Sequence, residues 1–255
     1  MIIAYILFSI ILFIILLWLA GFFMINDFSI KTIDYEELRS KKILIIFPHP
    51  DDEVMSCGGF IHKLSKTAEI TLHILTKGEK GTPNGKTDLK LKEIRTKEAQ
   101  EVSKILGINN LIIDDYGDGE LKNKKPRVTK RISEIIKKIK PYLIITYDLS
   151  GLYGHEDHIA VSEIATKLAK TRLWYVSVPE KLYKFIKLPE HMAKDLKFRD
   201  RRKYPTLKAY AGFRRIMALY AYKSQLSGFK KSFPMLPLWF SASMRVYEYF
   251  YEVEK

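Results

Sequence analysis

The sequence predicts an α/β fold: a Rossmann-like parallel sheet with helices on both faces, preceded by one N-terminal transmembrane helix. Apolar runs of strand length alternate with longer amphipathic segments between residues 43 and 178. This alternation is typical of a parallel sheet that is covered on both faces. Residues 1–26 carry no charge, whereas all 43 Lys and Arg residues and all 29 Asp and Glu residues follow them. The chain therefore combines an apolar N-terminal segment with a globular remainder.

The uncharged run Ile2–Ile25 is long enough to cross a membrane. At about 1.5 Å per residue, a helix of this length spans a hydrocarbon core of about 30 Å. A cleaved secretory signal would have a basic start and a shorter apolar stretch, so we expect an uncleaved anchor. The positive-inside rule then places the large domain in the cytoplasm, because four basic residues follow the run: Lys31, Arg39, Lys41 and Lys42.

The predicted strands and helices follow in order after the anchor. Continuous apolar runs predict strands at 43–47, 70–76, 111–113, 142–147 and 173–178. Helical periodicity predicts helices at 56–66, 88–106, 128–140 and 158–170. Gly, Lys, Thr, Pro and Asn residues in 78–85 predict a mobile loop after the second strand. The pattern predicts four parts, which are an anchor (1–26), a connector (27–42), a catalytic domain (43–226) and an aromatic C-terminal extension (227–255).

The composition of the remaining 229 residues restricts the class of protein. They contain enough Ile, Leu, Tyr and Phe to bury a core, which excludes disorder. The single cysteine, Cys57, permits no internal disulfide, so an oxidising compartment is not required.

Part of the net charge of +14 is concentrated in residues 194–215, where nine basic residues face two acidic ones. This segment is either a solvated basic face or a surface that rests on anionic lipid headgroups. The charge also raises the alternative of a membrane-tethered nucleic-acid binder. The sequence contains no motif for nucleic-acid recognition, and we expect no such partner.

Two clusters of metal-binding residue types follow predicted strands. They are Pro-His-Pro-Asp-Asp-Glu at 48–53 and Tyr-Gly-His-Glu-Asp-His at 153–158, and the carboxyl ends of strands are where open α/β sheets bind ligands. His49 and Asp52 can present an imidazole and a carboxylate to one point, and His158 would complete three ligands. Three ligands with one open position are typical of catalytic zinc, although two histidines and a carboxylate also suit Fe²⁺ and oxygen chemistry.

These motifs resemble those of the PIG-L, or LmbE-like, family of zinc-dependent de-N-acetylases, typified by N-acetylglucosaminyl-phosphatidylinositol de-N-acetylase. The resemblance covers residues 42–226 and rests on the two clusters together. Residues 93–98 are similar to the family's Arg-x-x-Glu helix, and residues 118–121 to its Asp-Gly-x-Leu loop. Residues 218–225 are similar to its Ala-Leu-x-x-His-x-Ser-Gln segment, except that Tyr222 stands at the His position.

The resemblance implies a role for each residue of the site. The implied Zn²⁺ ligands are His49, Asp52 and His158. Zinc would activate a water molecule for attack on an acetamide carbonyl, with Asp51 as the general base. His155 would stabilise the oxyanion, with Asp157 orienting its imidazole. The expected substrate-binding residues are Arg95, Asp118 and Tyr153.

The motifs and the anchor together predict a membrane-anchored hydrolase that removes acetate from an N-acetylglucosamine (GlcNAc) conjugate. Its expected partners are the lipid bilayer and a lipid-linked GlcNAc substrate. The alternative is a deacetylase of a soluble GlcNAc conjugate, such as a thiol precursor or a chitooligosaccharide. Neither the aglycone nor the oligomeric state follows from the sequence.

Overall fold

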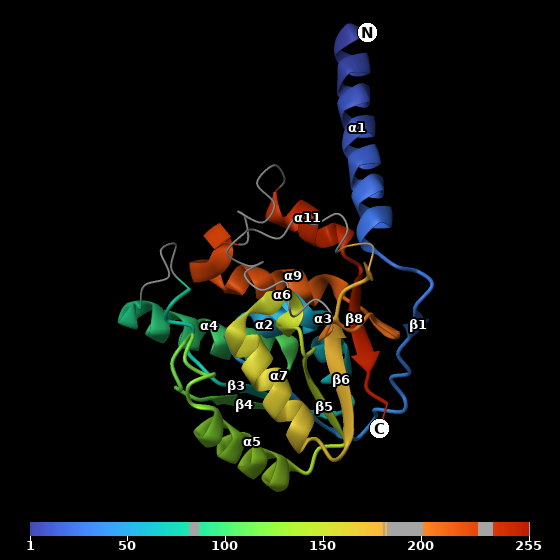
Figure 1. Cartoon of the computed structure of the whole chain (residues 1–255). Coiled ribbons are helices and arrows are strands. Elements are labelled where there is room, and N and C mark those ends of the chain that lie inside the picture. Colours follow the sequence, from blue (N-terminus) through green and yellow to red (C-terminus); the bar gives the residue numbers. More distant parts are fainter. Residues whose placement is uncertain (82–86, 181, 183–200, 229–236, 255) are drawn as a thin grey trace.

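The computed structural model describes residues 1–81, 87–180, 182, 201–228 and 237–254. Its centre is an eight-stranded sheet with the order β1-β7-β8-β6-β5-β2-β3-β4 (Figure 1). The strands are β1 (Lys31–Thr32), β2 (Lys42–Phe47), β3 (Glu69–Ile74), β4 (Asn110–Ile113), β5 (Leu143–Tyr147), β6 (Arg172–Ser177), β7 (Leu207–Tyr210) and β8 (Tyr247–Glu252). All five strands expected from the apolar runs are present.

The sheet is mixed rather than wholly parallel, which corrects the predicted fold class. Strands β4, β3, β2, β5 and β6 are parallel neighbours, and Ile45 of β2 pairs with Leu72 on one side and Ile145 on the other. Strand β8, however, is antiparallel to both β6 and β7. Both β1, from residues 27–42, and β8, from residues 227–255, belong to this same sheet.

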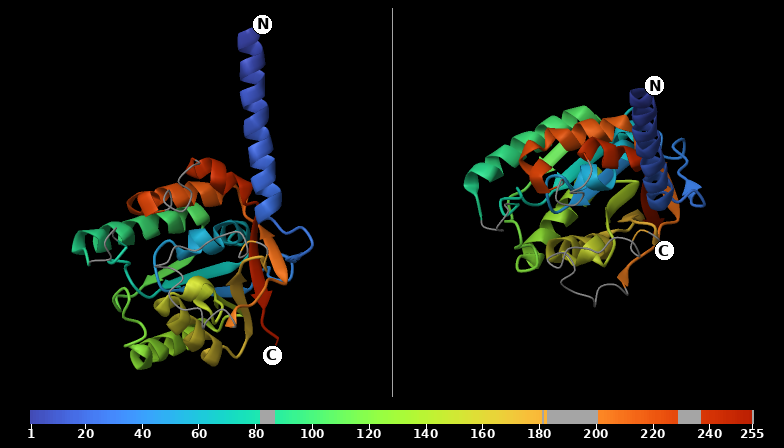
Figure 2. Two further views of the ribbon diagram at one scale, coloured as in Figure 1. Left: turned by 45° about the horizontal axis from the view of Figure 1, so that its top comes forward. Right: turned by 90° about the horizontal axis from the view of Figure 1, so that it is seen from above.

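Helices cover both faces of the sheet, as the alternating pattern predicts. On one face lie α3 (Gly58–Leu64), α4 (Leu89–Leu106) and α9 (Gly212–Ala221), and on the other lie α5 (Lys125–Ile139) and α7 (Glu156–Leu168) (Figure 2). Strand β2 contributes side chains to two hydrophobic cores, because alternate side chains of a strand point to opposite faces of the sheet. Ile43, Ile45 and Phe47 join the first core, and Leu44 and Ile46 join the second.

The predicted helix at 56–66 corresponds to α3, and a short helix that was not predicted, α2 (Asp52–Ser56), precedes it with Cys57 between the two. Glu248 of β8 explains the break, because its carboxylate accepts hydrogen bonds from the N–H groups of Gly59 (2.9 Å) and Phe60 (2.8 Å). A Cβ on Gly59 would overlap the Ala211 carbonyl, so the backbones must pass closely. The cap therefore comes from a residue 189 positions away, which local periodicity does not reveal.

Helix α1 (Ile2–Ile25) projects from the domain, and none of its residues is buried (Figure 1). Among the described residues it is the one helix whose length and composition would allow it to cross a membrane, and N-terminal signal segments share these features. The basic segment 194–215 is described from residue 201 onward. Lys208 and Arg215 are buried there, so neither belongs to the basic surface that the sequence predicts.

Candidate metal centre and active site

The first part of the site is the turn between β2 and α2. The Asp52 carboxylate accepts a hydrogen bond from the N–H of His49 (2.9 Å), and the Glu53 carboxylate accepts one from the N–H of Asp51 (3.2 Å). Asp51 has a φ of 99°, a conformation that costs a residue other than glycine about 1–3 kcal/mol. The hydrogen bonds hold this strained turn, which presents Asp51 beside His49.

The second part is the N-terminal end of α7, just beyond β5. His155 caps this helix, since its Nδ1 accepts a hydrogen bond from the N–H of Asp157 (3.2 Å). The Asp157 carboxylate is buried and accepts hydrogen bonds from the N–H groups of Gly119 (2.7 Å) and Leu121 (3.1 Å). It lies 3.2 Å from Nε2 of His49. The structure thus differs from the expectation that the Asp157 side chain orients His155: the carboxylate holds His49.

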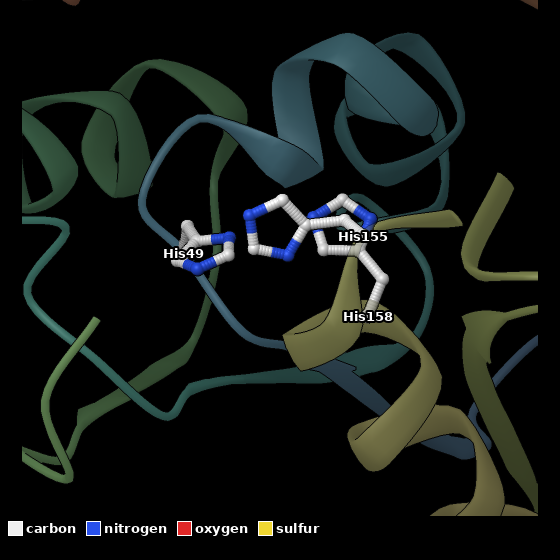
Figure 3. A group of neighbouring side chains, drawn as sticks. All are labelled: His49, His155 and His158. Atoms are coloured by element: carbon white, nitrogen blue, oxygen red, sulfur yellow. The ribbon is translucent and has the colours of Figure 1, made fainter. Parts of the chain in front are cut away.

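The two parts bring His49, Asp52 and His158 together. Nδ1 of His49 lies 3.6 Å from one oxygen of Asp52, and Nε2 of His158 lies 3.5 Å from the other. Figure 3 shows His49 facing His155 and His158, which project from the start of α7. Among the described residues, two sets of side chains place their possible ligand atoms within 4.8 Å of one another, and neither includes Asp52: they are His49 with His155 and His158, and His49 with Asp118 and Asp157.

The chemistry of these side chains fits a divalent metal ion. His158 is 1% exposed, and within the described parts of the chain neither of its ring nitrogens has a hydrogen-bond partner. Burial lowers the pKa of His158 to about 3, so its imidazole is neutral and able to donate a lone pair. Imidazoles combined with carboxylates are ligands for zinc and for iron.

The electrostatics around His49 also favour a cation. Burial acts to lower the pKa of His49, but hydrogen bonds to Asp118, Asp157 and Asp52 outweigh burial and raise the pKa well above 6.5. For Asp118, burial acts to raise the pKa, but the contact with His49 outweighs burial and the pKa is lowered. The buried carboxylates therefore stabilise positive charge where the candidate ligands converge.

Asp51 is paired with Arg95, a residue of α4 that the sequence assigns to substrate binding. The guanidinium is 3% exposed, and its Nη2 lies 3.0 Å from the Asp51 carboxylate. It also donates to the backbone carbonyls of Pro50 and Gly78. Burial raises the pKa of Asp51 to about 7, against the opposing charge of Arg95. Arg95 thus contacts Asp51, whereas the sequence predicts that it binds the substrate.

The other two expected substrate-binding residues lie beside the histidines. Asp118 is buried; one of its carboxylate oxygens is 3.1 Å from Nε2 of His49, and the other accepts a hydrogen bond from the N–H of Lys80 (3.0 Å). The ring of Tyr153 is half-buried, and its centre lies 5.1 Å from that of His158 and 6.1 Å from that of His155. Asp118 thus belongs to the charged cluster, and Tyr153 forms one wall of it.

Two tyrosines that the sequence did not assign to the site support this cluster. The Tyr147 hydroxyl donates to the Asp52 carboxylate (2.8 Å), and its ring stacks on His158 with the centres 4.2 Å apart. Tyr222, which stands at the family's His position, donates to the buried Glu53 carboxylate (2.6 Å). Burial raises the pKa of Glu53 to about 8, and this hydrogen bond opposes the rise. One sequence signal indicates a supporting role for Tyr147, which is its hydroxyl group at the end of an otherwise apolar strand.

The fold and the site define a class of protein: an α/β protein with a cluster of His and Asp side chains, suited to a divalent cation, at the carboxyl ends of parallel strands. Residues 44–169 match the sequence model of the PIG-L family, described as GlcNAc-PI de-N-acetylase. Residues 44–169 therefore form a domain of the PIG-L family, as the motifs predict.

Individual relatives give the same assignment. The chain is 30% identical over 172 residues to a 1D-myo-inositol 2-acetamido-2-deoxy-alpha-D-glucopyranoside deacetylase of Corynebacterium glutamicum, over 57% of this chain and 59% of that protein. It is 32% identical over 141 residues to a probable N-acetylglucosaminyl-phosphatidylinositol de-N-acetylase of Schizosaccharomyces pombe, over 53% of this chain and 54% of that protein. The chain thus spans little more than half the length of these relatives.

A solved structure shares the fold. The N,N'-diacetylchitobiose deacetylase of Pyrococcus horikoshii superimposes with a TM-score of 0.57 and 25% sequence identity, over 84% of each chain. That overlap is longer than the matched family domain, residues 44–169.

Proposed function

We propose that this protein is a metal-dependent N-deacetylase that hydrolyses the acetamide of a GlcNAc conjugate to acetate and a free amine. The observation that carries the proposal is the convergence of His49, Asp52 and His158 beside Asp51, within a PIG-L family domain. We assign His49, Asp52 and His158 as the metal ligands. A divalent metal at this point, Zn²⁺ in our assignment, supplies Lewis-acid activation of water and of the acetamide carbonyl.

Asp51 is the general base in this proposal. Its carboxylate takes a proton from the attacking water and returns it to the amine when the carbon–nitrogen bond breaks. Arg95 favours the ionised form of Asp51 and orients its carboxylate, since their charged atoms lie 3.0 Å apart. The strained turn at Asp51 fixes the same carboxylate from the backbone side.

His155 stabilises the oxyanion that develops on the carbonyl oxygen. Its Nδ1 accepts the N–H of Asp157, so the remaining proton of a neutral imidazole resides on Nε2 and points away from that contact. A donor of this kind, fixed before the reaction begins, is worth about 3–4 kcal/mol of transition-state stabilisation. Tyr153 and Asp118 lie close enough to the histidines to bind the sugar.

We further propose that α1 anchors the enzyme in a membrane, with the catalytic domain on the cytoplasmic side, and that the substrate is a GlcNAc lipid. The length and apolar composition of α1 support the anchor. A soluble GlcNAc conjugate is the alternative substrate class, because the C. glutamicum and P. horikoshii relatives are named for deacetylases of an inositol glycoside and of diacetylchitobiose.

The test is an acetate-release assay of the full chain on a panel of lipid-linked and soluble GlcNAc compounds, with metal content measured on the same preparation. We expect release that is lost on chelation and in His49→Ala, and restored to the chelated enzyme by Zn²⁺. Activity that survives complete metal removal would contradict the proposal. Equal rates on a soluble sugar and a lipid-linked one would favour the soluble substrate class, and Fe²⁺ in protein purified without added metal would change the assigned ion.

A further inference from the structure

Helix α1 is rigidly joined to the domain. Asn26, at its C-terminal end, is fully buried. The Asn26 side chain donates to the carbonyls of Phe22 (2.8 Å) and Met244 (2.7 Å), and accepts from the N–H groups of Val246 (3.1 Å) and Tyr247 (3.3 Å). One buried amide therefore satisfies both its donor and its acceptor across the helix end and the segment between α11 (Leu238–Met244) and β8.

Further contacts hold the last two turns of α1 against α11. The indole N–H of Trp18 donates to the Ser243 hydroxyl (2.9 Å). A Cβ at Gly21 would overlap the Met244 sulfur, so the Met244 side chain packs directly on the α1 backbone there. Beyond the helix end, the N–H of Asp27 donates to the Tyr249 hydroxyl (2.6 Å). The direction of α1 relative to the domain is therefore set by packing and hydrogen bonds, unlike that of a flexible tether.

The end of the domain that adjoins α1 exposes large apolar side chains. On α9, Phe213 is 71% exposed, and Met217 and Tyr220 follow at spacings of four and three residues, which place them on one face of the helix. Trp239 of α11 is 57% exposed. We call these four residues the α9–α11 face. Figures 1 and 2 show α9 and α11 at the end of the domain from which α1 projects.

The stretch of sequence that contains this face carries charge of one sign. Residues 201–247 contain ten Lys and Arg residues and no Asp or Glu. Arg214, next to Phe213, and Lys223, just beyond α9, are both exposed. Apolar side chains bordered by exposed cations are suited to the boundary between acyl chains and anionic headgroups.

The length of α1 sets the depth of this face in a bilayer. Residues 2–17 are exposed along the whole free part of the helix, and packing against α11 begins at Trp18. The free part is about 24 Å long at ~1.5 Å per residue, whereas a hydrocarbon core is about 30 Å thick. A helix α1 that spans the core therefore brings its contact with α11 to the hydrocarbon boundary.

We propose that the α9–α11 face lies in the headgroup–acyl boundary of the bilayer that α1 crosses, so that the domain is held on the membrane at two sites. This inference rests on the proposed anchoring by α1. Helix α9 also links that surface to the site, because Tyr222, which ends the helix, donates to Glu53 next to Asp52. The site then lies near the membrane surface, within reach of a sugar carried on a lipid.

The test uses the full chain in vesicles of phosphatidylcholine and phosphatidylglycerol, with an environment-sensitive fluorophore on single added cysteines. The positions are Phe213→Cys and Trp239→Cys on the face, Ile10→Cys within α1, and Lys138→Cys on the exposed surface of α5 as the matched control. The native Cys57 is buried, and labelling of the unsubstituted chain measures its background. Lipids with a quencher on the acyl chain report contact with the bilayer.

We expect the labels at 213 and 239 to shift to shorter wavelength and to lose about half of their emission or more to the quencher, since such faces lie about 5–10 Å below the surface. The label at 138 should not change. Quenching at 10 without quenching at 213 and 239 would overturn this inference and leave the anchor intact. No quenching at 10 would overturn the anchor as well. A shifted but unquenched label at 213 would overturn the inference in favour of a second copy of the chain covering the face.

Discussion

The candidate metal centre and the α9–α11 face depart from ordinary side-chain burial in opposite directions. Around His49, ionisable groups are buried and satisfy one another, as in the contacts of His49 with Asp118 and Asp157. On the α9–α11 face, Phe213 and Trp239 are mainly exposed and contribute little to the core. Buried charge and clustered exposed apolar surface both cost free energy unless a ligand or partner compensates. From this difference we infer a different partner for each region, which is a cation at the metal centre and a lipid boundary at the α9–α11 face.

The largest effect should follow from Asp51→Asn at the metal centre. The amide keeps the shape of the side chain but cannot accept a proton, so kcat should fall by about 10²–10⁴-fold. The matched control is Asp115→Asn, an exposed carboxylate whose loss should leave kcat unchanged. Circular dichroism should show both variants folded, and activity of Asp51→Asn within a few-fold of the native enzyme would remove Asp51 from the mechanism.

Arg95→Gln should raise the pKa of Asp51 and so change the pH dependence of kcat. Burial raises the pKa of Asp51, and Arg95 opposes this rise. Without the guanidinium the pKa rises further, because a close opposite charge is lost. Because the base must be ionised, the acidic limb of the kcat profile should move to higher pH, and activity at saturating substrate should recover in alkaline buffer. A loss confined to KM, with an unmoved limb, would instead identify Arg95 as a substrate-binding residue.

Tyr222→Phe should lower the free energy of unfolding, and so test how the buried groups beside the metal centre are stabilised. Removing the hydroxyl leaves one oxygen of the buried Glu53 carboxyl without its donor, which costs about 1–3 kcal/mol. Burial raises the pKa of Glu53 from 4.5 to about 8, so its contribution to stability is present below pH 4.5 and is lost as pH rises towards 8. The Tyr222 hydrogen bond limits this loss. Urea titrations should therefore show a larger cost of Tyr222→Phe at pH 8 than at pH 5, and a cost independent of pH would contradict the assignment.

The smallest effect on stability should come from Phe213→Ser on the α9–α11 face. An exposed phenylalanine contributes little to the core, so the free energy of unfolding should change by about 0.5 kcal/mol or less. Phe60→Ser, at a side chain that is 0% exposed, is the matched control and should cost about 3–5 kcal/mol. Thermal melts in mild detergent compare the two, and a large loss for Phe213→Ser would indicate that the face packs against the protein itself.

The elements with local signals could be predicted from the sequence, and those with distant partners could not. The strands β2 and β5 and the helices α4 and α7 follow from runs and periodicities within a few residues of one another. The break at Cys57 depends on Glu248, and the antiparallel strand β8 inserts between β6 and β7 from the far end of the chain. Neither leaves a local pattern, because the groups that satisfy the backbone there lie far away in the sequence.

By itself, the sequence determined the two clusters at 48–53 and 153–158, the parallel part of the sheet and the apolar helix α1, because each depends on neighbouring residues or on a fixed period. Only the tertiary structure decided that Asp157 holds His49, that Arg95 faces Asp51, that Tyr222 supports Glu53 and that α1 is fixed to α11. The physical reason is that burial and short-range contacts set the charge and direction of a side chain. The chain acquires those contacts only when the sheet brings distant segments together.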